Sequence, residues 1–166
     1  MVAFNGILLW FHIFAAASWF GAVMLFATVV GPTIGDFTPS TSGEVVVKML
    51  PKYLRYIMIF TGLTPILGLV TALSSSGGSM SIFVPNSDFG VYILAGALLS
   101  LVAWVVTFGV VYPTGKKIVR ITEEVVRDKS PQPPQLPKLA MRLKISSGIG
   151  LALLIAILIC MVAANF

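Results

Sequence analysis

This 166-residue chain has few charged residues and a single cysteine. Only 10% of its residues are Asp, Glu, Lys or Arg, against roughly 25% in a typical soluble domain. The single cysteine, Cys160, can form no disulfide within the chain, and there is no Cys-x-x-Cys metal site. The sequence also lacks the zinc-protease, nucleophile-elbow and phosphate-loop motifs. These absences argue against a soluble domain and leave hydrolytic and phosphoryl-transfer chemistry without candidate residues.

Long apolar runs are what the chain has instead. Hydrophobic residues make up 57% of it, and the mean hydropathy is +0.98. A helix needs roughly 20 apolar residues to cross a hydrocarbon core about 30 Å thick. We therefore predict an all-α integral membrane four-helix bundle, a single domain over residues 1–166 whose spans cover residues 4–30, 53–73, 89–112 and 145–164.

The basic residues are confined to two of the three connections. All 11 Lys and Arg lie within residues 48–55 and 116–144. Because positive residues favour the cytoplasmic side of a membrane, we predict that both termini and the loop at residues 74–88 lie outside the cell membrane. The net charge of +5 does not indicate nucleic acid as a partner, since the basic residues flank apolar spans.

Residues 115–137 are predicted to form a cytoplasmic arm. Ile118, Ile121 and Val125 recur at helical spacing, so we expect the third helix to continue to residue 128. The proline-rich residues 131–137 then predict a stiff extended spacer. The basic side of the arm is expected to contact anionic lipid head groups, with a docking surface for a partner subunit as the alternative. No internal repeat is evident.

His12, the only histidine, is the main candidate for chemistry. A polar ring inside a membrane span is costly unless it has a partner or a function. Ala15, Ala16 and Trp19 follow it at i+3, i+4 and i+7, so they share its helix face. Two small residues and an indole on that face leave room for a flat macrocycle beside the ring. This pattern makes His12 a candidate metal ligand.

The sequence leaves two questions about His12: whether its role is structural, and which residue would be a second ligand. A purely structural hydrogen bond to Thr64 or Ser100 on a neighbouring helix would also satisfy the ring. With the N-terminus outside, His12 lies about 12 Å below the outer boundary. Met161, about one turn nearer the surface, is the intrachain candidate for a second ligand. A copper ion is a poor fit, because one imidazole with distant thioethers makes a weak site.

The first helix also resembles known membrane families. Leu-Trp-Phe-His at residues 9–12 and Trp-Phe-Gly at residues 19–21 resemble the first helix of the copper-resistance-D-like (CopD-like) proteins and of HemJ, the four-helix protoporphyrinogen oxidase family. The basic lead-in Lys-Tyr-Leu-Arg at residues 52–55, followed by Leu-Gly-Leu at residues 67–69, is similar to the second helix of both groups. The resemblance implies a b-type heme on His12 and an association with copper handling or membrane redox chemistry.

Together these observations predict an integral membrane accessory protein or subunit of a membrane redox or copper-dependent complex, binding heme b through His12 and not an enzyme by itself. Its predicted partners are the lipid bilayer and either other membrane subunits or further copies of this chain. The alternatives are a noncatalytic structural subunit without a cofactor, packed through small-residue faces, and a HemJ-like protoporphyrinogen oxidase.

Overall fold

The computed structural model describes residues 2–164, with the backbone alone at residues 2, 3, 81 and 82, and this part of the chain is helical without any strand. The first rod joins α1 (Val2–Leu25), a π-helical segment η1 (Phe26–Val30) and α2 (Gly31–Asp36). It is followed by α3 (Pro39–Ser75) and the short helix η2 (Met80–Phe83). The second rod joins α4 (Asp88–Val106), a π-helical segment η3 (Thr107–Val111) and α5 (Tyr112–Asp128), and α6 (Gln135–Ala163) completes the chain.

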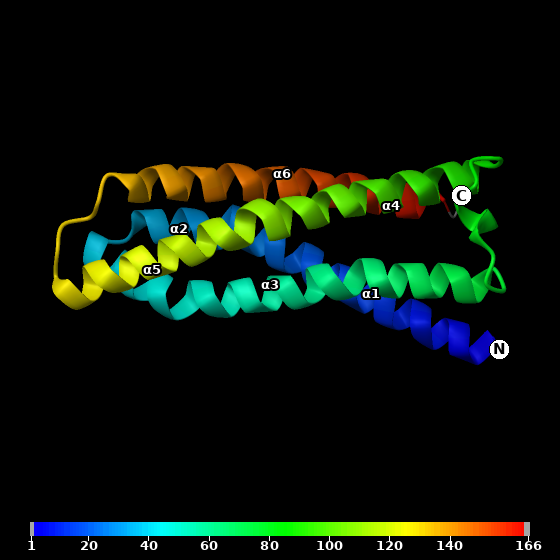
Figure 1. Ribbon diagram of the computed structural model, residues 1–166, viewed down its shortest axis with the longest axis horizontal. Coiled ribbons are helices and arrows are strands. Elements are labelled where there is room, and N and C mark those ends of the chain that lie inside the picture. Colours follow the sequence, from blue (N-terminus) through cyan, green and yellow to red (C-terminus); the bar gives the residue numbers. More distant parts are fainter. Residues whose placement is uncertain (1, 165–166) are drawn as a thin grey trace.

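The rods and the two remaining helices form two antiparallel hairpins (Figure 1). In the first hairpin α1 packs against α3, and in the second α4 packs against α6. Both chain ends lie at one end of the bundle, together with η2 (Figure 1). We call the opposite end, which carries the turns at residues 37–38 and 129–134 and the lysines and arginines, the basic end.

Four helices are long and apolar enough to cross a membrane. The prediction of an all-α, four-helix membrane protein is therefore confirmed. The helices extend beyond the predicted spans, however, because α3 begins at Pro39 and α6 at Gln135. The rod over Asp88–Asp128 has 41 residues, which is about 61 Å at 1.5 Å per residue and about twice the thickness of a hydrocarbon core.

The extra helix length lies at the basic end and forms a second packed layer. One buried cluster, in the half of the bundle toward the chain ends, contains Trp19, Val23, Ile57, Ala103 and Leu154. A second cluster at the basic end contains Phe26, Leu50, Leu54, Val111, Ile118 and Leu143. Each cluster draws side chains from both rods and from α3 and α6. The helix predicted for residues 115–128 is thus confirmed, and its apolar stripe is buried against α3.

The proline-rich spacer is shorter than predicted. Only residues 129–134 lie between α5 and α6, and Pro137 belongs to the first turn of α6. The first N–H groups of a helix need no partner within it, so a proline is tolerated there. The expectation of an extended segment through residue 137 is therefore wrong, and the arm predicted over residues 115–137 ends in the first turn of α6.

Both rods contain a π-helical turn directly before a proline. The Gly31 N–H donates to the Phe26 carbonyl, and the Tyr112 N–H donates to the Thr107 carbonyl. Pro32 and Pro113 follow at the next position in each rod. A proline inside a helix lacks an N–H and clashes with the carbonyl four residues earlier, and widening the turn by one residue accommodates it.

The outer surface of the bundle is apolar. Phe4, Ile66 and Ile159 are each more than 60% exposed, although they belong to the apolar runs. A large exposed apolar surface is unfavourable in water and favourable in lipid. This surface indicates that the chain is a multi-pass membrane protein with a bilayer as its environment.

Candidate functional site

His12 is held against α3 by a hydrogen bond. Its Nδ1 lies 3.1 Å from the backbone carbonyl oxygen of Thr64. A carbonyl only accepts, so Nδ1 carries the hydrogen, and in the neutral ring Nε2 keeps its lone pair. Metal-ligating histidines are oriented in the same way, with one ring nitrogen donating to a carbonyl and the other free to coordinate. The predicted alternative, a bond between His12 and Thr64, is confirmed at this carbonyl.

Gly68 lets the His12 ring lie directly on the backbone of α3. A Cβ atom at this position would approach the ring carbon Cε1 to 2.9 Å and Nδ1 to 3.3 Å. Any larger residue would push the ring away from the Thr64 carbonyl. The close packing of the His12 ring therefore explains why the Leu-Gly-Leu segment has a glycine at this position. Ser100, the other predicted partner, instead donates its hydroxyl hydrogen to the Ala97 carbonyl at 2.7 Å.

The other predicted site residues of α1 lie in a closed helix interface. Ala15 and Trp19 are each 2% exposed, and Ala16 is half-buried. Trp19 packs in the cluster with Ile57 and Ala103. These side chains follow His12 along one face of α1, and that face packs against α3. The side of the ring toward α3 is thus filled by protein.

Two buried polar atoms near this face lack a partner among the described residues. They are the Trp19 indole Nε1 and the Thr61 hydroxyl Oγ1. Thr61 is fully buried, one turn from Ile57 on α3. An orphaned buried donor is costly, so such atoms mark places where a water or another group completes the site.

Met161 lies against the second hairpin. A Cβ atom at Gly96 of α4 would come within 2.5 Å of the Met161 Cε. This contact belongs to the packing of α4 on α6, whereas the contacts of His12 with Thr64 and Gly68 belong to the packing of α1 on α3. Within residues 2–164 there is also no group of three or more His, Cys, Asp or Glu able to hold a metal ion.

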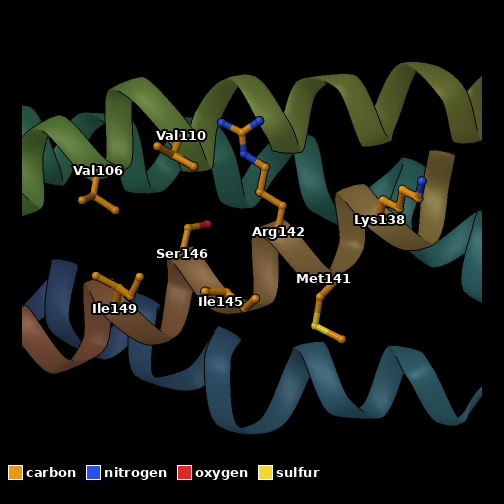
Figure 2. Close-up of a pocket in the computed structure, with 8 residues that line it drawn as sticks. All are labelled: Val106, Val110, Lys138, Met141, Arg142, Ile145, Ser146 and Ile149. Carbon is orange, nitrogen blue, oxygen red and sulfur yellow. The ribbon is translucent and has the colours of Figure 1, made fainter.

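Two surface clefts lie beside the π-helical segments, and sequence reasoning missed both. The first cleft, of about 470 Å³, lies between α1 and α3 and includes Phe26, Lys52, Tyr53 and Tyr56. The second cleft, of about 430 Å³, lies between the second rod and α6 and includes Val106, Val110, Lys138, Arg142 and Ile149 (Figure 2).

Two short sequence patterns, each present once in each hairpin, mark the positions of the clefts. Each rod carries Val-Val-x-Pro-Thr, at residues 29–33 and 110–114. Each partner helix carries Leu-Pro-Lys, at residues 50–52 and 136–138, and the lysine lines the cleft of its own hairpin. The two hairpins thus share a short sequence pattern. The expectation that the chain has no internal repeat missed it.

Comparisons with protein-family models, with curated proteins and with solved structures find no match for this chain. The class that the fold defines is a multi-pass helical membrane protein. The similarity to the copper-resistance-D-like and HemJ families rests on the residues quoted above and stays a prediction.

Proposed function

We propose that this chain is a membrane-embedded accessory subunit of a redox or copper-dependent complex, in which Nε2 of His12 is an axial ligand of a b-type heme. One observation carries the proposal. Nδ1 is fixed by the Thr64 carbonyl and the ring is only half-buried, so Nε2, which lies beside the α3 backbone at Gly68, is the ring nitrogen left to coordinate a metal. The heme would supply one-electron chemistry, and His12 would hold and orient it.

The described residues fit one axial ligand and no more. Ala15 and Trp19 are each 2% exposed, and Trp19 is packed by side chains of α3, α4 and α6, so a macrocycle cannot enter on that face of α1. Met161 packs on Gly96 in the other hairpin. A second ligand, where the heme has one, would therefore come from a partner subunit or another copy of this chain. This requirement favours a role as a subunit over a role as an independent enzyme.

The second candidate function is a noncatalytic packing subunit, and the contact of His12 with Gly68 favours it. A ring seated on a glycine and bonded to a carbonyl also joins α1 to α3 without any cofactor. Such an interhelical bond contributes about 0.6 to 2 kcal/mol in a membrane interior.

Two substitutions of His12 separate these functions. In the chain isolated with its native partners, His12→Asn and His12→Ala should both remove the heme absorption band, because neither side chain is a good iron ligand. Asn keeps an N–H that can reach the Thr64 carbonyl, so it should retain more resistance to unfolding by dodecyl sulfate than Ala. Met161→Leu is the matched control and should leave the band in place. A colourless wild-type complex would contradict the heme proposal and leave the packing function.

We also propose that the basic end faces the cytoplasm and that both termini lie outside the cell membrane, from the placement of the lysines and arginines. Single cysteines at Ser76 and at Lys129, each in a Cys160→Ser background, test this. An impermeant maleimide added to intact cells should label the first position and spare the second. Labelling at Lys129 alone would show the inverse orientation.

A further inference from the structure

We propose that the cleft between the second rod and α6 is a binding site for one anionic phospholipid of the leaflet at the basic end. The head group would lie at Lys138 and Arg142, and an acyl chain along Val106, Val110 and Ile149. The proposal concerns the hairpin that does not contain His12, so it is independent of the heme.

The depth of the lining residues matches the depth of a lipid. Lys138 and Arg142 lie one turn apart on α6, just before the predicted start of the span at residue 145. Ile149 lies about 10 Å farther along α6 than Arg142, at 1.5 Å per residue. Cations therefore stand where phosphates lie in a bilayer, and the apolar lining stands where acyl chains begin.

The two cations are free to bind an anion. The ion pairs in the described part of the chain join Lys48 to Glu44, Arg120 to Glu124 and Arg127 to Asp128. Neither cation of the cleft takes part in them, and no acidic residue lines the cleft. A guanidinium and an ammonium one turn apart can contact the same phosphate, and the guanidinium can do so through two N–H groups.

The side chains are arranged as this occupant requires. Figure 2 shows Arg142 and Ser146 reaching from α6 toward the helix that carries Val106 and Val110. The Ser146 hydroxyl already donates to the Leu143 carbonyl at 3.1 Å, so the two cations are the polar groups available to a ligand. The cleft volume, about 430 Å³, is within the range of roughly 300–1,000 Å³ found for small-molecule sites. Ile149 is 50% exposed, and the bilayer supplies acyl chains at that surface.

The test compares two double variants of equal charge. The full chain is placed in phosphatidylcholine nanodiscs with and without phosphatidylglycerol, and retained lipid is identified by native mass spectrometry after release. Lys138→Gln with Arg142→Gln should weaken phosphatidylglycerol retention about tenfold or more, because the charge-assisted contacts of both cations with the phosphate are lost. Lys116→Gln with Lys117→Gln, on exposed positions of α5 outside the cleft, should leave it unchanged. Equal losses in both would show general surface attraction and overturn the proposal.

Two further arms separate a lipid from a free anion and from misfolding. Ile149→Trp fills the apolar part and should release phosphatidylglycerol although both cations remain. Added inorganic phosphate should not displace the lipid; displacement by phosphate, or retention in Ile149→Trp, would show a plain anion site and overturn the acyl-chain assignment. Far-UV circular dichroism verifies that each variant is folded, and Arg142→Gln alone replaces the double variant where that one fails.

Discussion

The first and second hairpins have the same backbone feature, but different side chains lie around it. Each has a π-helical turn before a proline in its rod, and each has a cleft beside that turn. In the first cleft Phe26 stacks on Tyr53, with ring centroids 4.1 Å apart, and Lys52 is the single cation. In the second cleft no aromatic residue is present and two cations line the wall. The same local geometry thus supports an aromatic contact in one hairpin and an anion-binding wall in the other.

The hairpins also differ in how their glycines are used. In the first, Gly68 accepts a rigid imidazole that is fixed by a hydrogen bond. In the second, Gly96 accepts the end of a flexible methionine. Close approach of helices in membranes commonly relies on small residues. Only the first hairpin joins such an approach to an imidazole.

The largest expected effect contrasts two tryptophans. Trp19→Ala in the first hairpin should lower the free energy of unfolding by about 3 to 5 kcal/mol, because it empties a buried position. Trp104→Ala in the second hairpin should cost under about 1 kcal/mol, because that indole is 38% exposed. Unfolding by dodecyl sulfate in mixed micelles measures both. Equal losses would show that the two hairpins do not differ in burial as described.

The next effect contrasts the two glycines. Gly68→Ala should cost about 1 to 3 kcal/mol, since the new Cβ meets the fixed His12 ring. Gly96→Ala should cost under about 1 kcal/mol, since the Met161 side chain has rotatable bonds and can move. Gly62→Ala is the control, because a Cβ there meets nothing within 4 Å. The same micelle titration applies, and a loss at Gly62 as large as that at Gly68 would refute the contact with His12.

The smallest effect concerns surface ion pairs, one in each hairpin. Glu44→Gln removes the pair with Lys48 at 3.8 Å, and Glu124→Gln removes the pair with Arg120 at 3.3 Å. Both pairs are exposed, so each should contribute less than about 0.5 kcal/mol, and less still in high salt. Thermal unfolding at two ionic strengths measures the difference. A loss above 1 kcal/mol, about twice that limit, would mean that one of these charges has an additional partner.

The sequence predicts the fold well because hydropathy and charge act along the chain. Apolar runs and the placement of the basic residues give the four helices, and the spacing of Ile118 and Ile121 gives the helical extension. The helix starts at Pro39 and Gln135 are missed, because these helix ends do not belong to long apolar runs. They are stabilised by packing on one another at the basic end. The clefts are missed because they depend on two helices that meet only in three dimensions.

For the candidate site, the sequence identifies His12 and proposes Thr64 as its partner. It cannot give the role of Gly68, because the contact joins residues 56 positions apart, from 12 to 68. Nor can it show that Trp19 is enclosed by α3, α4 and α6 rather than lining open space. Those facts arise from how closely two helices approach each other, which depends on every small residue along their interface.

The π-helical turn at Thr107–Val111 has one more consequence, which concerns the contacts of the second rod. Before that turn the second rod packs mainly on α6, and after it the same rod packs mainly on α3. An extra residue in one turn rotates the downstream face by about 100° relative to an unbroken helix, which is the phase change needed to exchange neighbours. One continuous helical rod therefore contacts both hairpins. The second rod thus contacts α6 of its own hairpin on one side of the turn and α3 of the other hairpin at the basic end.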